Sequence, residues 1–180
     1  MKLTVRDLTK IALFTALTAV GAFIKIPLPY VPFTLQVFFV TLSGVLLGPK
    51  KGALSQLLYV LIGLLGVPIF TQGGGLSYIF KPTFGYLIAF IPGAYITGLI
   101  VEKLQAKSVW KIFAAMIPGL FVIYLIGVTY LYIINNFYVG KDFSLWLSIY
   151  YGFIPFIGGD LLSSFLGAIL STKLMPILKN

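Results

Sequence analysis

One segment of the sequence interrupts its long apolar runs: Val67-Pro-Ile-Phe-Thr-Gln-Gly-Gly-Gly-Leu-Ser-Tyr-Ile-Phe-Lys-Pro-Thr-Phe-Gly-Tyr86. Pro68 and Pro82 flank a triple glycine, and neither proline suits the interior of a helix. Irregular backbone exposed to lipid would leave polar groups unsatisfied, so such a loop between membrane helices lines or caps a cavity. We therefore predict that this segment, the central loop, closes a cavity. The alternative is a plain external loop.

The composition indicates an integral membrane protein. Of the 180 residues, 59% are hydrophobic and 9% are charged, whereas soluble domains carry about 25% charged residues. The length suits a single domain spanning residues 1–180. The net charge of +9 lies at the ends of apolar runs, which argues against a nucleic-acid partner. Cysteine and histidine are absent, which excludes disulfides, thiol nucleophiles and thiolate or imidazole metal sites.

Six apolar segments predict an all-α fold of six transmembrane helices. They cover about Leu8–Ile24, Thr34–Leu47, Ala53–Gly66, Phe84–Val101, Phe113–Ile134 and Leu145–Leu174. The second and third segments are too short to cross a bilayer alone, which takes at least about 17 residues. We expect a tight link over residues 48–52 and a break of the last segment around Gly158 and Gly159. The first segment is read as a retained helix; a cleaved signal peptide is the alternative.

The distribution of lysine and arginine predicts the orientation. With six helices, ten of the 13 basic residues fall on the side that holds both termini. Only Lys25, Lys81 and Lys141 fall on the other side. By the positive-inside rule, both termini are cytoplasmic and the central loop is external.

Three polar side chains are expected at one depth in the outer half of the membrane. Counting about 1.5 Å per helical residue, Asp160 lies about 20 Å above the basic boundary of its helix. The same count places Gln36 and Tyr86 about 21 and 24 Å above theirs. A carboxylate inside the membrane is by default a functional-site hypothesis. The three residues therefore predict a pocket open to the outside, and a purely structural hydrogen bond of Asp160 is the alternative.

Two ladders of small residues permit close helix approach. Ala12 and Ala16 form one in the first helix, and Gly159, Ser163, Gly167 and Ser171 form the other in the last. No catalytic set emerges, and no Gly-x-x-x-x-Gly-Lys-Ser/Thr phosphate loop is present. The chain is therefore not expected to be an enzyme or to hydrolyse ATP itself.

Several of these motifs resemble one known family. They are Pro32-Phe-Thr-Leu-Gln36, Gly44-Val-Leu-Leu-Gly-Pro-Lys-Lys-Gly52, Tyr59, Gly63-Leu-Leu-Gly-Val-Pro-Ile-Phe70, Gly73-Gly-Gly75 and Pro82-Thr-Phe-Gly-Tyr86. The chain resembles the BioY family, the biotin-specific S components of energy-coupling factor (ECF) transporters. The resemblance implies a six-helix protein of the bacterial plasma membrane that binds biotin from outside. It also implies a transmembrane T component and two ATPases as partners, with Ala12 and Ala16 contacting the T component.

The resemblance also implies a ligand site, and the chain departs from the family pattern at one position of the last helix. The last helix of the family typically carries Pro-Gly-Asp followed three residues later by lysine, whereas this chain has Gly158-Gly159-Asp160 and then Ser163. We expect Asp160 to accept a ureido N–H of biotin, with the further substrate-binding residues Gln36, Tyr86, Thr34, Phe70, Gly73, Gly74, Tyr78, Lys81 and Phe84. The aromatic residues would pack against the ligand, and the glycine amides with Lys81 would hold its carboxylate. A solvated Lys81 is the alternative.

Biotin is expected as the transported ligand, with no cofactor, and ATP would be used by the partner subunits. Two alternatives stay open. One keeps the fold but binds another vitamin or transports slowly without the ATPases. The other is a membrane protein without a transport role, which the missing catalytic set disfavours.

Overall fold

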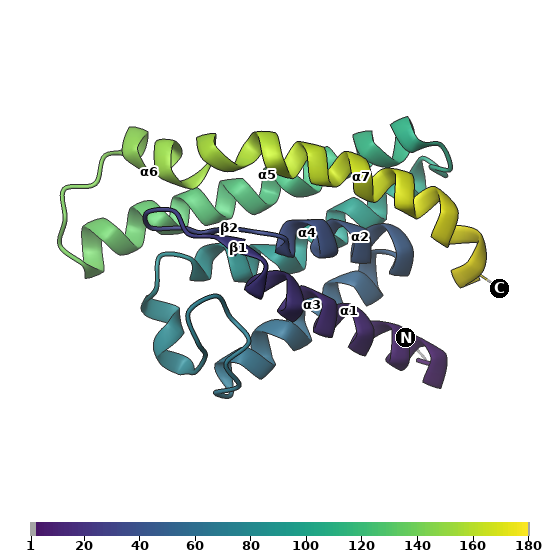
Figure 1. Ribbon diagram of the computed structural model, residues 1–180, viewed down its shortest axis with the longest axis horizontal. Helices are drawn as coiled ribbons and strands as arrows, with labels where there is room; N and C mark the ends of the chain where they lie inside the picture. Colours follow the sequence, from purple (N-terminus) through teal and green to yellow (C-terminus); the bar gives the residue numbers. More distant parts are fainter. Residues whose placement is uncertain (1–2, 180) are drawn as a thin grey trace.

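The computed structural model describes residues 3–179, which form a bundle of helices (Figure 1). The helices are α1 (Val5–Phe23), α2 (Gln36–Leu47), α3 (Pro49–Leu64), α4 (Phe84–Lys103), α5 (Val109–Ile133), α6 (Leu145–Gly152) and α7 (Ile154–Lys179). Shorter elements are β1 (Lys25–Ile26), β2 (Phe33–Thr34), the 3-10 helix η1 (Leu76–Phe80) and the π-helix η2 (Ile134–Tyr138). Since α6 and α7 continue one another, the bundle has six helical passes, as predicted.

The three longest passes have the length and apolarity of membrane spans. Among the described residues they are Phe84–Lys103, Val109–Tyr138 and Leu145–Ile177. The second and third helices are short, as expected, with 12 residues in α2 and 16 in α3. The protein is thus a multi-pass membrane protein in which α2 does not cross a bilayer alone.

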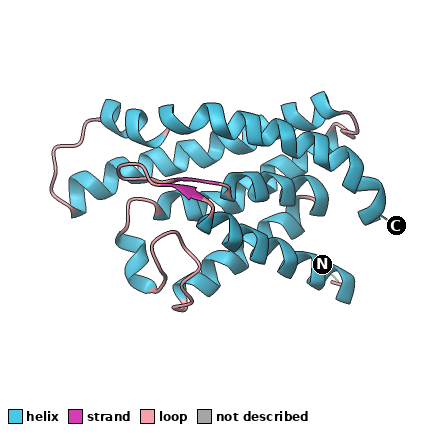
Figure 2. Cartoon of the chain, in the orientation of Figure 1, coloured by secondary structure: helices cyan, strands magenta, loops and turns pink. Residues whose placement is uncertain are grey.

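Both termini lie at one end of the bundle, and the central loop lies at the other end (Figure 1). The β1–β2 hairpin and the connection between η2 and α6 extend toward the same end as the central loop (Figure 2). The common end of the termini agrees with an even number of passes. Which end faces the cytoplasm stays a prediction from the lysine and arginine distribution.

The link between the second and third helices is shorter than predicted. Residues 49–52 are the first turn of α3, and only Gly48 separates α2 from α3. Pro49 occupies the start of the helix, where its fixed φ suits the first turn and its missing N–H would have had no intrahelical partner. The prediction of a five-residue link was wrong because a proline there starts a helix.

The break in the last apolar segment is also placed differently from the prediction. It falls at Phe153, between α6 and α7. Pro155 has no N–H to continue the helical ladder, and its ring would clash with the carbonyl four residues earlier. Gly158 and Gly159 lie inside α7 instead. A Cβ at Gly159 would lie 2.6 Å from the Phe33 ring, so this glycine makes room for β2.

Small residues of α7 serve internal packing. Gly167 lies against Phe38 of α2 and Met116 of α5, and Ser171 is buried. Ala12 and Ala16 on α1 are exposed instead. The two ladders therefore have different surroundings, one inside the bundle and one on its outer face.

Candidate functional site

A cavity lies where the hairpin and the central loop meet α2, α4, α5 and α7. It is a small cavity of about 50 Å³ and is partly open to the surroundings. Much of the wall is apolar, including Val31, Phe33, Ile123 and Phe156. The polar residues in the wall are Thr34, Gln36, Thr71, Thr83, Tyr86, Tyr124 and Asp160. An apolar wall with a few placed polar groups is typical of a small-ligand site.

Asp160 is the acidic group of this cavity. It lies on α7 with 4% of its surface exposed, and its Oδ2 accepts a hydrogen bond from the Tyr124 hydroxyl of α5. Ser163 does not reach the carboxylate; its hydroxyl donates to the Asp160 backbone carbonyl oxygen at 3.0 Å. An ionised carboxylate can accept several hydrogen bonds. One tyrosine leaves acceptor capacity for a ligand that donates N–H groups.

Gln36 is held in one orientation by its neighbours. The Thr34 hydroxyl donates to its Oε1 at 3.1 Å, and its Nε2 donates to the Tyr59 hydroxyl at 2.8 Å. Tyr59 in turn donates to the carbonyl oxygen of Ile69 in the central loop at 3.0 Å. The chain of hydrogen bonds joins the cavity wall to the central loop. A buried network with every member paired holds its side chains rigid.

The Tyr86 hydroxyl already donates its proton to a hydrogen bond within the protein. It donates to the Gly152 carbonyl oxygen at 2.7 Å, across the end of α6. Its oxygen can still accept a hydrogen bond, because a hydroxyl has two lone pairs. Tyr86 is 8% exposed and lies close to Gly127 of α5, so its ring is packed between helices.

The structure thus brings Thr34, Gln36, Tyr86 and Asp160 to one cavity. A family profile described as "BioY family" matches residues 1–180. The chain belongs to the BioY family.

Similarity to named proteins covers nearly the whole chain. A protein of Lysinibacillus sphaericus named "Probable biotin transporter BioY" is 45% identical over 97% of this chain and 89% of its own length. "Biotin transporter BioY" of Thermotoga maritima is 44% identical, covering 96% of this chain and 97% of its own. A crystal structure of "the S-component for biotin from an ECF-type ABC transporter" superposes with a TM-score of 0.85 at 26% identity, covering 97% and 95% of the two chains. The resemblance seen in the sequence is confirmed.

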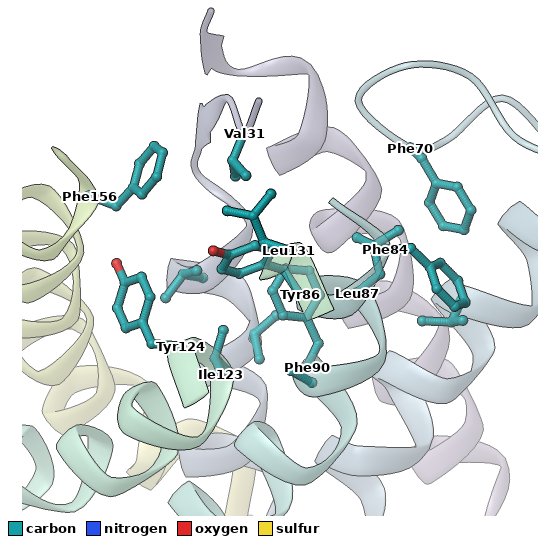
Figure 3. Packing of buried hydrophobic residues seen from close by; sticks show 14 of the residues in the cluster. Val31, Phe70, Phe84, Tyr86, Leu87, Phe90, Ile123, Tyr124, Leu131 and Phe156 are labelled. Carbon is teal, nitrogen blue, oxygen red and sulfur yellow. The ribbon is translucent and has the colours of Figure 1, made fainter. Parts of the chain in front are cut away.

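Three aromatic residues that were predicted to bind the ligand do not line the cavity of this BioY family member: Phe70, Tyr78 and Phe84. Phe70 packs against Tyr59 and Tyr78, with ring centroids 5.4 and 4.6 Å apart. Phe84 packs against Tyr130. Figure 3 shows Phe70 and Phe84 set apart from Tyr124 and Phe156. Their packing serves the central loop in this structure, and their contact with a ligand stays a prediction.

The predicted anion-binding groups of the central loop also lie outside the cavity wall. The amides of Gly73 and Gly75 donate to the carbonyl oxygens of Phe70 and Gly63, at 3.2 and 2.7 Å. Those two amides are therefore engaged within the protein. Gly74 packs so closely that a Cβ would lie 2.3 Å from the Val67 carbonyl oxygen. Lys81 is exposed and does not line the cavity that the described residues form.

Tyr78 supports the cavity from behind. Its hydroxyl shares a hydrogen bond with Thr71 at 2.9 Å and accepts one from Thr83 at 3.1 Å, and both threonines line the cavity. The sequence interpretation missed Thr71, Thr83 and Tyr124. A signal for Tyr124 existed, because it follows Lys111 by 13 residues and so lies about 20 Å above it. That is the depth predicted for Asp160.

Proposed function

We propose that this BioY family chain binds biotin in the cavity around Asp160 and functions as the S component, the substrate-binding subunit, of an ECF-type importer. The single observation that carries the proposal is the buried Asp160 carboxylate in a largely apolar cavity. The names of the relatives, which are biotin transporters, agree with it. A carboxylate held in the membrane is functional by default because of the free energy that its insertion costs.

The chemistry of biotin matches the wall. Its ureido ring offers two N–H donors and a carbonyl acceptor, and its thioether ring is apolar. Asp160 would accept ureido N–H groups, while Ile123 and Phe156 cover the apolar ring. Gln36 and Tyr86 supply further polar contacts: Thr34 and Tyr59 already hold the Gln36 amide, so biotin would meet a preformed group.

Transport requires energy that this chain does not carry. Its sequence has no phosphate loop, so ATP would be hydrolysed by two partner ATPases, coupled through a transmembrane T component. The exposed Ala12 and Ala16 support a partner surface on α1. Small side chains allow another helix to approach closely, and neither alanine is needed to pack α1 onto its own bundle.

A thermal-shift panel on the detergent-purified chain tests the proposal. Biotin at 100 times its Kd should stabilise the folded protein by about 2.7 kcal/mol, because it binds the folded state alone. Riboflavin, thiamine and folate at equal concentration should have no effect. Stabilisation by one of these vitamins and not by biotin would assign the fold to another cargo. No stabilisation by any of them would contradict a vitamin-binding role.

A further inference from the structure

Lys25 places a cation beside one wall residue of the cavity. It lies on β1, and its Nζ donates to the backbone carbonyl oxygen of Thr71 at 2.5 Å. Thr71 lines the cavity. Lys25 also pairs across the hairpin with Thr34, another residue of the wall. The ammonium therefore sits between two segments that border the cavity, although 46 residues separate Lys25 from Thr71.

The ammonium has capacity for a further partner. A lysine carries three N–H donors, and the Thr71 carbonyl is a neutral acceptor that uses one of them. Lys51 forms an ion pair with Asp7 at the other end of the bundle, and no ion pair is found for Lys25 within residues 3–179. Lys25 therefore has no carboxylate partner in the described part of the chain. An anionic ligand group that extends from the cavity past Thr71 would form a charged hydrogen bond with it.

The two other lysines on this side of the bundle are placed differently. Lys81 is exposed, and like Lys25 it is not part of the cavity lining formed by residues 3–179. Lys141 lies over the ring of Tyr30, 5.8 Å from its centroid. Lys25 differs from both because it contacts a residue of the cavity wall directly.

The charges of the cavity give a ligand one direction. Asp160 is 4% exposed and lines the cavity, whereas Lys25 is exposed and lies outside the lining, beside Thr71. A ligand carboxylate beside Asp160 would be repelled by the like charge, and beside Lys25 it would be attracted. A ligand with a neutral N–H donor group at one end and a carboxylate at the other would enter with its carboxylate outward.

We infer that Lys25 is the specificity-determining residue for the ligand's carboxylate. The inference rests on the proposed function, in which biotin supplies a ureido group and a valerate carboxylate. Lys25 would hold the carboxylate while its bond to Thr71 keeps the hairpin against the central loop. Recognition of the acid would then depend on a strand residue outside the helices.

Binding of biotin and of biotinamide to the purified full-length chain tests the inference. Biotinamide keeps the rings and the chain but replaces the carboxylate by a neutral amide. The unsubstituted protein should bind biotin about tenfold or more tightly than biotinamide, since a charged hydrogen bond is lost. Lys25→Met should weaken biotin by the same factor and leave biotinamide unchanged, so the ratio of the two Kd values approaches one. Lys25→Arg should keep the ratio.

Lys141→Met is the matched control, because it removes one positive charge from the same end of the protein and should leave the ratio unchanged. Equal weakening of both ligands by Lys25→Met would show that Lys25 only holds the hairpin, and would overturn the inference. Loss of the ratio in Lys81→Met, with Lys25→Met unaffected, would also overturn it. If the unsubstituted protein bound neither ligand, the proposed function itself would fail.

Discussion

Replacing Asp160 with asparagine tests the centre of the proposed site. The substitution keeps the side-chain volume and removes the charge. The Asp160 carboxylate accepts one hydrogen bond, from the Tyr124 hydroxyl, and is almost fully buried. In Asp160→Asn the remaining oxygen can still accept from Tyr124. The new amide N–H₂ would then face the ureido N–H groups of biotin, and two donors cannot bond to one another.

The expected size of the effect follows from these contacts. Hydrogen bonds to charged groups contribute about 1.5–3 kcal/mol each. Loss of even one should weaken biotin binding at least about tenfold, because 1.4 kcal/mol is a factor of ten in Kd. The folded protein should be as stable as before or more so, since a neutral amide costs less to hold inside the membrane than a carboxylate.

Titration calorimetry with biotin, performed on the monodisperse fraction of each variant, measures the change in Kd. Thermal unfolding without ligand reports stability separately. Asp142→Asn is the matched control: it removes an exposed carboxylate from the loop before α6 and should change neither quantity. A folded Asp160→Asn protein with an unchanged Kd would remove Asp160 from the site and leave it a structural role.

Three further predictions address the partner surface, the topology and the buried network. Ala16→Trp should leave biotin binding intact but impair uptake with the T component and ATPases. The control Leu166→Trp, at a 53% exposed position on α7, should impair neither binding nor uptake. Loss of binding in Ala16→Trp would show that the ladder packs internally. Ser77→Cys should react with an impermeant thiol reagent in intact cells and Lys107→Cys only in opened cells, since the chain has no native cysteine; the reverse pattern would invert the topology. Tyr59→Phe should lower the free energy of unfolding by about 1–3 kcal/mol, because buried polar partners lose their hydrogen bonds; an unchanged thermal unfolding midpoint would contradict this.

Much of the fold was readable because the rules that govern it are local. A run of apolar residues is long enough to span a bilayer or it is not, and this predicted the short α2 and the six passes. The boundary errors at Pro49 and Pro155 were also local. Both prolines begin helices, and the sequence interpretation treated the first as part of a link and overlooked the second.

The relative position of a residue along the bundle was likewise predictable from the chain alone, because helical rise accumulates evenly with residue number. Asp160, Gln36 and Tyr86 were predicted at similar depth, and they line one cavity. Tyr124 fits the same count. The sequence by itself therefore determined the class of protein, the number of passes and the level of the polar groups.

Only the tertiary structure decided which side chains at that level face the cavity. The direction of a side chain depends on how its helix is rotated against its neighbours, and helix packing sets that rotation. Phe70 and Phe84 are aromatic, as residues that contact a small ligand often are, but they pack against other rings of the protein. Lys25 lies 46 residues from Thr71, and no local rule brings the two together. Their contact depends on a hairpin and a loop folding over the same helices, which is a property of the packed chain.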